Sequence, residues 1–368
     1  MKKIIVCNYK IDIVSGAEKA IVDMLVPLKE YFNFVMYVPG EGKLSKFYEN
    51  NGFIVHIQKL SNKRRKYPGL HLYHSIKFAN YLKKEKFDFI LCNTFFAANK
   101  VATAAKISKI PMGLFVREYF DCHDKNYKRY LNIAKVIFAV SEDVKNALKN
   151  FHQNILVTHD FIDIQMISSS IAKNSKKISL PTNTNNQGPK IAIIGRITPY
   201  KQQDLFIKSF FFVKQAFPNI EYYIVGDSSP KEEYFKNTLI KESKNSNIHF
   251  LGNRNDVYSI LSLFDITCMV SDREPFPRVI LESQYLEIPV IASNTGGALE
   301  MIDDYQSGIF FNVKEKKPEI LAEKIIELLK NKSLSDKIKI NGKKNLLDTF
   351  ATKKTIDNFR LCLEKNIG

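Results

Sequence analysis

The sequence predicts an α/β protein of two domains, each a parallel sheet wound on both faces by helices. Short apolar runs typical of buried strands, at residues 4–7, 190–194 and 222–225, alternate with helical patterns along the chain. This alternation favours strand-helix units over an all-β or all-α architecture. With 368 residues, the chain is long enough for two domains of ordinary size.

A linker is predicted near the middle of the chain. The segment 168–190 contains the cluster SLPTNTNNQGPK, whose Pro, Asn, Thr and Gly content is typical of a loop. We therefore expect a first domain over residues 1–175, a linker over 176–189 and a second domain over 190–350. The remaining residues, 351–368, are expected to form a last helix.

Cysteine and histidine usage favours a cytoplasmic protein without a metal site. The five cysteines are odd in number and include no C-x-x-C pair, which argues against a disulfide framework or structural zinc. The seven histidines show no H-E-x-x-H spacing. Asn8 and Lys10 interrupt the first apolar run before a signal-peptide core could form, and no run of about 18 apolar residues follows.

The most informative motif lies at residues 273–302, where Glu274 and Glu282 stand eight positions apart. Pro275 favours an extended backbone at Glu274, and Pro277 suits the first turn of a helix, so Glu282 should lie about one turn into that helix. The free amides and positive dipole at such a helix start attract phosphate. Two solvated surface acids remain the alternative interpretation in so charged a chain.

The order of elements after this motif carries a family resemblance. A strand at 289–293 and the turn Thr295-Gly296-Gly297 follow, with Glu300 beyond them. This order resembles the donor-sugar half of the retaining glycosyltransferases of the GT-B fold, the large group 1 family with a Glu-x7-Glu motif. The resemblance implies two facing Rossmann-like domains with a cleft between them, where ligands would bind outside the carboxyl ends of the strands. It also implies that the last helix, 351–368, crosses back to the first domain.

The resemblance extends to a pair of cations after the strand that ends at Gly195. Arg196 and Lys201 fall five positions apart, before a helical run at 204–217. In the family the matching residues grip the diphosphate of a nucleotide-sugar. Fixed cations suit this role because negative charge grows on the departing diphosphate, and Arg offers a planar fork where Lys offers a point charge. The alternative is a pair of exposed basic residues, although a helix start disfavours cations.

Further donor contacts are implied by the resemblance. Glu282 would bind the ribose hydroxyls, and Glu274 would hold hydroxyls of the transferred sugar. By the same resemblance, Asn253 and Arg254 would border the nucleobase, whereas Asp256 is expected to cap a helix. The implied donor site comprises Gly16, Gly195, Arg196, Lys201, Gly226, Asn253, Arg254, Glu274, Phe276, Arg278, Val279 and Glu282.

Two positions depart from the family pattern. Arg117 stands where the family usually has a histidine near the reacting sugar, and a guanidinium cannot shuttle a proton as imidazole can. We interpret Arg117 as stabilising phosphate charge or an acceptor. Pro277 replaces a common glycine and lacks an N–H, which leaves the amides of Arg278 and Val279 as donors to the diphosphate. The expected catalytic residues are Glu274, Arg196, Lys201 and Arg117.

The net charge of +17 is concentrated in the first half of the chain. Residues 1–175 hold 27 Lys and Arg against 15 Asp and Glu, whereas residues 176–368 hold 28 against 23. The basic cluster Lys63, Arg64, Arg65 and Lys66, beside apolar residues, suits an anionic membrane surface. A solvated basic loop is an equal alternative. Nucleic acid is not expected as a partner, because no recognised binding motif accompanies the charge.

The resemblance implies a retaining glycosyltransferase that moves a hexose-type sugar from a nucleotide-diphosphate sugar to a glycan or lipid-linked acceptor. The product would be a cell-surface polysaccharide or glycolipid, made at the inner face of the membrane. No metal or other cofactor is expected, since Arg196, Lys201 and the helix amides supply the positive field. The alternatives are a nucleotide-sugar epimerase on the same fold and a catalytically silent GT-B binding module. The sugar, nucleobase, acceptor and linkage are not predicted.

Overall fold

The computed structural model describes residues 1–60, 68–119, 125–174, 178–182, 188–351 and 353–367. The chain divides into two compact units: unit 1 is Met1–Phe161 with Thr352–Gly368, and unit 2 is Ile162–Ala351. The division thus falls before helix α7 (Ile164–Asn174), whereas the sequence analysis expected a linker at 176–189. Helix α7 groups with unit 2 because it packs on α10 (Val257–Leu261) of that unit.

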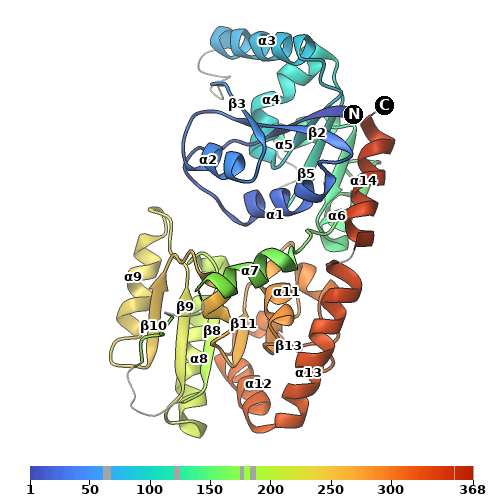
Figure 1. Cartoon of the computed structure of the whole chain (residues 1–368). Helices are drawn as coiled ribbons and strands as arrows, with labels where there is room; N and C mark the ends of the chain where they lie inside the picture. Colours follow the sequence, from blue (N-terminus) through green and yellow to red (C-terminus); the bar gives the residue numbers. More distant parts are fainter. Residues whose placement is uncertain (61–67, 120–124, 175–177, 183–187, 352, 368) are drawn as a thin grey trace. The chain divides into compact units, whose positions relative to one another are not determined.

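Unit 1 contains a seven-stranded sheet in the order β3-β2-β1-β4-β5-β6-β7, of which β2, β3 and β5 are labelled in Figure 1. Every strand pairing is parallel, so each connection must cross over the sheet. The strand order reverses between β1 and β4, which makes this edge the topological switch point of the sheet. The strands are β1 (Lys2–Cys7), β2 (Phe32–Val38), β3 (Ile54–Ile57), β4 (Phe89–Cys92), β5 (Met112–Val116), β6 (Val136–Ala139) and β7 (Ile155–Val157).

Helices cover both faces of this sheet, as parallel strands with buried side chains require. The last helix, α14, belongs to this unit, and its Phe359 ring lies 5.4 Å from that of Phe115 and 5.5 Å from that of Phe138, between ring centroids. The helices of unit 1 are α1 (Gly16–Leu25), η1 (Val26–Leu28), α2 (Lys43–Asn50), α3 (Pro68–Lys84), α4 (Phe95–Ser108), α5 (Lys125–Ile133), α6 (Glu142–Leu148) and α14 (Lys353–Ile367).

Unit 2 contains a six-stranded parallel sheet in the order β10-β9-β8-β11-β12-β13. Its switch point lies between β8 and β11, where the first strand of the unit meets the fourth. The strands are β8 (Lys190–Ile194), β9 (Glu221–Val225), β10 (Ile248–Gly252), β11 (Ile266–Met269), β12 (Val290–Ser293) and β13 (Ile309–Phe311).

Aromatic packing holds helix α8 of unit 2 against the sheet. The rings of Phe206 and Phe210 lie 4.5 and 5.2 Å from that of Tyr222 in β9, and all three side chains are fully buried. The helices of unit 2 are α7, η2 (Pro199–Lys201), α8 (Gln203–Ala216), α9 (Glu233–Glu242), α10, α11 (Arg278–Tyr285), η3 (Gly296–Glu300), η4 (Val313–Glu315), α12 (Pro318–Lys330), α13 (Lys332–Asn345) and η5 (Leu346–Phe350).

The predicted fold class is confirmed, since each unit is a doubly wound α/β domain with a parallel sheet. Among the residues described, no helix has the length and apolar character needed to cross a membrane. The cysteines that the structure describes, Cys7, Cys92, Cys268 and Cys362, are all free thiols.

Candidate functional site

An ion pair between Lys201 and Glu274 lies at the switch point of unit 2. Lys201 ends η2, which follows β8, and Glu274 lies in the loop after β11. The Lys201 Nζ atom donates to both carboxylate oxygens of Glu274 at 2.5 Å. The two side chains are only 14% and 17% exposed. Because β8 and β11 are neighbours, the pair bridges the carboxyl ends of the strands, where ligands bind in such sheets.

Hydrogen bonds fix Glu274 on both its side chain and its backbone. The Ser271 hydroxyl donates to Glu274 Oε2 at 2.8 Å, and the Gly297 N–H donates to the Glu274 carbonyl at 2.8 Å. Ser293, at the end of β12, donates in turn to the Ser271 carbonyl at 2.7 Å. A Cβ atom at Gly297 would lie 2.1 Å from the Pro275 carbonyl oxygen, so this close approach requires glycine.

The glycines that end β8 and β9 let two loops meet backbone to backbone. Gly195 and Gly226 have φ angles of +149° and +136°, and a Cβ atom at Gly226 would lie 2.0 Å from the Gly195 carbonyl oxygen. The predicted residues Gly195 and Gly226 are therefore structurally required here. A Cβ atom at Gly195 would also lie 3.6 Å from Lys201 Nζ, so this glycine leaves space beside the ammonium group.

Three further residues, which the sequence analysis missed, tie η2 to the loop after β11. The Asp272 N–H donates to the Tyr200 carbonyl at 2.9 Å, and the Gln202 side-chain amide donates to the Asp272 carboxylate. The Tyr200 ring centroid lies 5.5 Å from Lys201 Nζ. Asp272 lies two residues before Glu274, but an isolated Asp in a charged chain carries no signal of such a contact.

Arg196 is exposed directly after β8, and only its backbone is held by a described hydrogen bond. The side-chain amide of Gln203 donates to the Arg196 carbonyl at 2.9 Å. Among the described residues, the Arg196 guanidinium forms no ion pair. Its positive charge is therefore available to an anionic ligand at this edge of the sheet.

Helix α11 carries the second predicted glutamate. The helix begins at Arg278 after Pro277, as expected, and Glu282 lies about one turn in. The Arg278 Nε atom lies 3.7 Å from Glu282 Oε1, and the two side chains are 11% and 13% exposed. Phe276 is largely buried, with its ring centroid 6.0 Å from that of Phe350, so its ring packs within the unit.

The predicted nucleobase contacts Asn253 and Arg254 follow β10 and lie on the surface. Arg254 donates to both oxygens of Asp256, from Nε at 2.8 Å and from Nη2 at 2.6 Å. Asp256 does stand at the N-terminus of α10, but the expected side-chain cap is absent. That expectation was wrong because the neighbouring guanidinium engages both carboxylate oxygens, and the resulting hydrogen bonds lower the pKa of Asp256.

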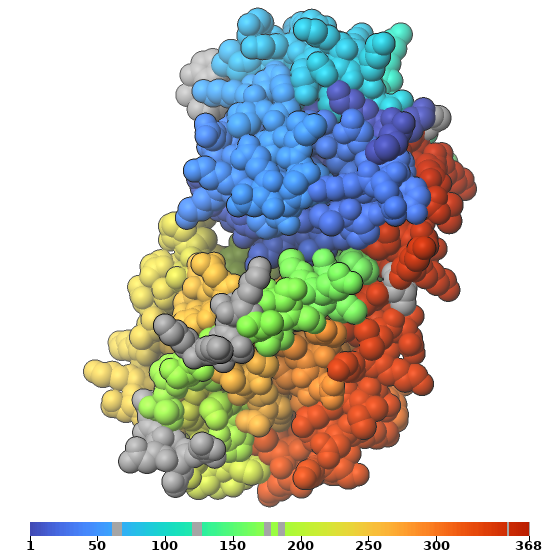
Figure 2. Space-filling view, viewed as in Figure 1, coloured from blue at the N-terminus to red at the C-terminus, as the bar shows by residue number. Residues whose placement is uncertain are grey.

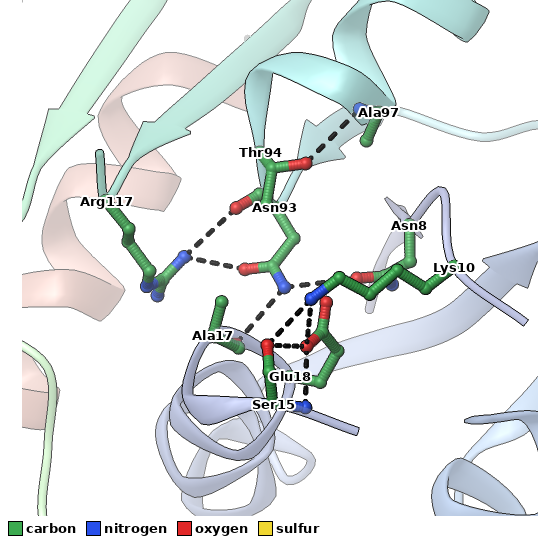
Figure 3. A network of polar contacts seen from close by, with 9 residues as sticks. All are labelled: Asn8, Lys10, Ser15, Ala17, Glu18, Asn93, Thr94, Ala97 and Arg117. Carbon is green, nitrogen blue, oxygen red and sulfur yellow. Dashed lines mark hydrogen bonds and ion pairs between the residues drawn. The ribbon is translucent and has the colours of Figure 1, made fainter. Parts of the chain in front are cut away.

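Arg117, in unit 1, is engaged by protein groups (Figure 3). Its Nε donates to Asp160 Oδ1 at 3.0 Å, and its Nη1 donates to Asn93 Oδ1 at 2.6 Å. The guanidinium carbon also lies 4.0 Å from the Phe115 ring centroid. With side chains only 8% and 5% exposed, Arg117 and Asp160 neutralise each other. This geometry favours a positioning role for Arg117 over direct contact with a ligand.

The turn that contains Gly16 is built around a fully buried carboxylate. Glu18 Oε2 accepts hydrogen bonds from the Ser15 N–H at 2.9 Å and from the Ser15 hydroxyl at 2.5 Å. The Lys10 ammonium donates to Ser15 Oγ at 2.7 Å and to Glu18 Oε2 at 3.1 Å (Figure 3). A Cβ atom at Gly16 would contact nothing within 4 Å. The space over Gly16 is therefore open, and close packing does not require a glycine at this position.

Asn93 joins the ends of β1 and β4 across the switch point of unit 1. Its side-chain amide donates to Asn8 Oδ1 at 3.1 Å and to the Ala17 carbonyl at 3.2 Å. Glu118 follows Arg117 near the same edge, and burial raises the pKa of its carboxyl group, an effect that the charge of Lys10 opposes. Sequence reasoning missed these polar residues because their partners are distant in the chain.

The structure offers no ready metal site in the part of the chain that it describes. No group of three or more His, Cys, Asp or Glu side chains there could hold a metal ion. The charged groups at the switch point of unit 2 include two cations, Arg196 and Lys201, and the carboxylates of Glu274 and Asp272.

Family models match the two halves of the chain in order. Residues 14–166 match the model described as Glycosyltransferase Family 4, and residues 174–345 match the model described as Glycosyl transferases group 1. Together with the parallel sheets described above, these matches support a group 1 glycosyltransferase of the GT-B fold.

Two similar proteins are named for capsular polysaccharide and O-antigen biosynthesis. The chain is 25% identical over 224 residues to the capsular polysaccharide biosynthesis glycosyltransferase CapM of Staphylococcus aureus. This alignment covers 59% of this chain and 58% of CapM. It is 29% identical over 178 residues to the O-antigen biosynthesis glycosyltransferase WbnH of Escherichia coli, and this alignment covers 48% of this chain and 47% of WbnH. The chain thus spans about half the length of these curated relatives.

Solved structures establish the fold over the whole chain. Alr3699/HepE of Anabaena, solved in complex with UDP and glucose, aligns with a TM-score of 0.84 at 20% identity and covers 99% of both chains. A glycosyltransferase from Rickettsia africae aligns with a TM-score of 0.78 at 21% identity, over 100% of this chain and 98% of that one. The fold is therefore GT-B.

Proposed function

We propose that this protein is a retaining glycosyltransferase that moves a sugar from a nucleotide-diphosphate sugar to a glycan or lipid-linked acceptor. The observation that carries the proposal is the Lys201–Glu274 pair at the switch point of unit 2, together with Arg196, which follows β8 and has no acidic partner in the part of the chain that the structure describes. HepE, which shares the fold, was solved with UDP-glucose, and this supports the class of donor. The names of CapM and WbnH support a role in the synthesis of a cell-surface polysaccharide.

Donor binding would change the partner of Lys201. A diphosphate carries more negative charge than one carboxylate, so the ammonium would turn from Glu274 towards the phosphate oxygens. Arg196 and the amides of Arg278 and Val279 would complete the grip. Because negative charge grows on the diphosphate as the sugar leaves, these donors stabilise the transition state more than the bound substrate.

Release from Lys201 would give Glu274 its second function. Its two oxygens would become acceptors for hydroxyls of the transferred sugar, while Ser271 keeps the carboxylate oriented through its 2.8 Å hydrogen bond. Glu282, one turn into α11, would accept hydrogen bonds from the ribose hydroxyls. Glu282 Oε1 forms an ion pair with Arg278 Nε at 3.7 Å, a distance too long for a strong hydrogen bond. The oxygens of Glu282 therefore retain the capacity to accept hydrogen bonds.

Retention and metal independence follow from the family resemblance. In the proposed step the bond from the anomeric carbon to the diphosphate oxygen breaks, and an acceptor oxygen attacks from the same face. The acceptor proton passes to the departing phosphate oxygen, so no protein nucleophile is required. Arg196, Lys201 and the helix amides supply the positive field, with no cofactor beyond the donor substrate.

The expected location is the cytoplasmic face of a membrane, where a lipid-linked acceptor would be reached. The basic residues on which this expectation rested, Lys63, Arg64, Arg65 and Lys66, lie outside the described residues. The proposal therefore depends on the charge excess of the first half of the chain, 27 Lys and Arg against 15 Asp and Glu over residues 1–175.

A donor screen followed by a transfer assay tests the proposal. Nucleotide-sugars are first tested for thermal stabilisation, since a ligand at about 100 times its Kd adds about 2.7 kcal/mol. The stabilising donor is then assayed with candidate acceptors, with and without a chelator, and product stereochemistry is read by NMR. We expect acceptor-dependent transfer with retention that the chelator does not reduce.

Each alternative predicts a different result of the same experiment. An epimerase would convert the nucleotide-sugar without any acceptor, and a silent GT-B module would show neither donor binding nor turnover. An inverted product, or loss of activity with the chelator that a divalent ion restores, would contradict the retaining, metal-independent mechanism.

A further inference from the structure

Helix α3 of unit 1 presents an apolar group of side chains to solvent. Its inward side is formed by buried residues that recur at helical spacing, including Ser75, Phe78 and Leu82. On the outward side, the four large apolar side chains that are between 42% and 61% exposed are Leu70, Leu72, Tyr73 and Ile76. Singly exposed apolar residues are ordinary, but several on two successive turns mark an interaction surface.

The inward side of α3 holds the helix firmly to the sheet. The Phe78 ring lies 5.0 Å from that of Tyr37 in β2, and the Tyr81 ring stacks on His56 of β3 at 3.7 Å, between ring centroids. None of the outward apolar side chains takes part in these ring contacts, and each is between 42% and 61% exposed. Their exposure is therefore not required by the fold, and replacing them should leave the unit folded.

The outward side of α3 changes from apolar to cationic along the helix. Lys77, Lys83 and Lys84 are exposed in its second half, and the helix contains no acidic residue. The sequence from residue 50 to residue 84 has eight Lys and Arg and no Asp or Glu. A second copy of this chain, with the same net charge of +17, would be repelled by such a surface.

We propose that this outward side, termed the membrane face, docks on an anionic lipid bilayer. It comprises Leu70, Leu72, Tyr73, Ile76, Lys77, Lys83 and Lys84, and helix α3 lies on the visible surface of unit 1 in Figure 2. The apolar residues enter the boundary between headgroups and acyl chains, and the lysines contact lipid phosphates. The inference deepens the proposed membrane location by naming the surface, and it does not depend on the transfer reaction.

Vesicle binding tests the apolar part of the membrane face. The unaltered chain should sediment with vesicles that contain phosphatidylserine, and much less with phosphatidylcholine alone. The triple variant L72S/Y73S/I76S should bind the anionic vesicles at least about tenfold more weakly, because three apolar side chains no longer enter the bilayer. The matched control is Y234S/I340S/L361S, which removes side chains that are 86%, 65% and 54% exposed on α9, α13 and α14 and should bind as the unaltered chain does.

The cationic part is tested by the triple variant K77S/K83S/K84S. Each lysine removed should weaken binding about fivefold at low salt, the equivalent of about 1 kcal/mol per cation near an anionic surface. The difference should shrink as salt is added. The matched control removes three exposed lysines of α13, as K332S/K337S/K344S, and should have a much smaller effect.

Insertion itself can be detected with a single fluorophore, because the chain contains no tryptophan. In the variant Tyr73→Trp, anionic vesicles should shift the emission to shorter wavelength, and brominated lipids should quench it. Absence of both effects in a variant that still sediments would mean adsorption without insertion and would overturn the apolar part of the inference.

Other outcomes would overturn the inference as a whole. The unaltered chain could fail to bind anionic vesicles at low salt, or each α3 variant could bind no more weakly than its matched control. A dimer in sedimentation velocity that L72S/Y73S/I76S abolishes would assign the surface to a second copy instead. Donor binding measured on the same samples separates this inference from the proposed function, since either can fail while the other holds.

Discussion

The switch points of the two sheets carry the same pair of residue types in different environments. In unit 1, Lys10 pairs with Glu18, whose side chain is fully buried and is also hydrogen-bonded by Ser15. In unit 2, Lys201 pairs with Glu274, and both side chains remain partly exposed, at 14% and 17%. A carboxylate sealed from solvent offers no surface to an incoming ligand, whereas a partly exposed one can exchange its partner for a ligand.

The second cation at each switch point follows the same division. Arg117 in unit 1 is neutralised by Asp160, with both side chains less than a tenth exposed. Arg196 in unit 2 is exposed, and among the described residues it has no acidic partner. Unit 2 therefore keeps positive charge available for an anion, while unit 1 uses its charges internally. The comparison indicates that burial, more than residue type, separates a binding site from a structural network.

The largest expected effect is on the stability of unit 1. The change Lys10→Ala leaves Glu18 buried without its cation, which should lower the free energy of unfolding by about 3 kcal/mol. Urea denaturation measures this change. The neighbouring control Lys19→Ala, at an exposed position of α1, should change stability by less than about 0.5 kcal/mol. Equal stability of the two variants would contradict the structural role of the Lys10–Glu18 pair.

The second prediction concerns turnover in unit 2. Lys201→Ala and Arg196→Ala should each reduce sugar transfer about a hundredfold or more, because each removes a cation from the growing negative charge of the leaving group. Lys208→Ala is the control, since this exposed lysine of α8 forms a surface ion pair with Asp204, at 3.8 Å. Steady-state kinetics with donor and acceptor measures the effect. Turnover at the control's level in both variants would remove the diphosphate assignment.

The third prediction separates the two glutamates of unit 2. Glu282→Gln should weaken the binding of both the free nucleotide diphosphate and the nucleotide-sugar about tenfold, because both ligands contain the ribose that Glu282 is proposed to bind. Glu274→Gln should spare the free nucleotide and damage transfer. Isothermal calorimetry compares the two ligands in each variant, and the reverse pattern would mean that the two roles are exchanged.

The smallest expected effect is a pH dependence in unit 1. Burial raises the pKa of Glu118 above its ordinary value of 4.5, so the folded state holds this proton more tightly than the unfolded state does. Between the two pKa values, stability should fall as pH rises, since the folded chain binds more protons there. Glu118→Gln should remove this fall and leave stability unchanged at lower pH. Thermal unfolding measures stability against pH in the unaltered chain and in Glu118→Gln. The same dependence in both proteins would contradict a raised pKa of Glu118 in the folded state.

The sequence alone was sufficient for the fold class and for most of unit 2's candidate residues. Alternating strand and helix patterns are local, and they predicted two doubly wound domains, which the structure confirms. Proline and glycine also act locally, so the start of α11 after Pro277 and the turns at Gly195 and Gly226 were predictable. The roles proposed for these residues in catalysis stay predictions.

The tertiary structure decided which charges meet and which remain free. Lys201 and Glu274 are 73 residues apart, and they touch because the sheet places β8 beside β11. Arg117 and Asp160 are 43 residues apart, and their contact turns a predicted ligand contact into a neutralised pair. The grouping of α7 with unit 2 likewise depends on its packing against α10. Local sequence patterns specify each element, but strand order and burial are properties of the assembled sheet, and these determine what each charge can do.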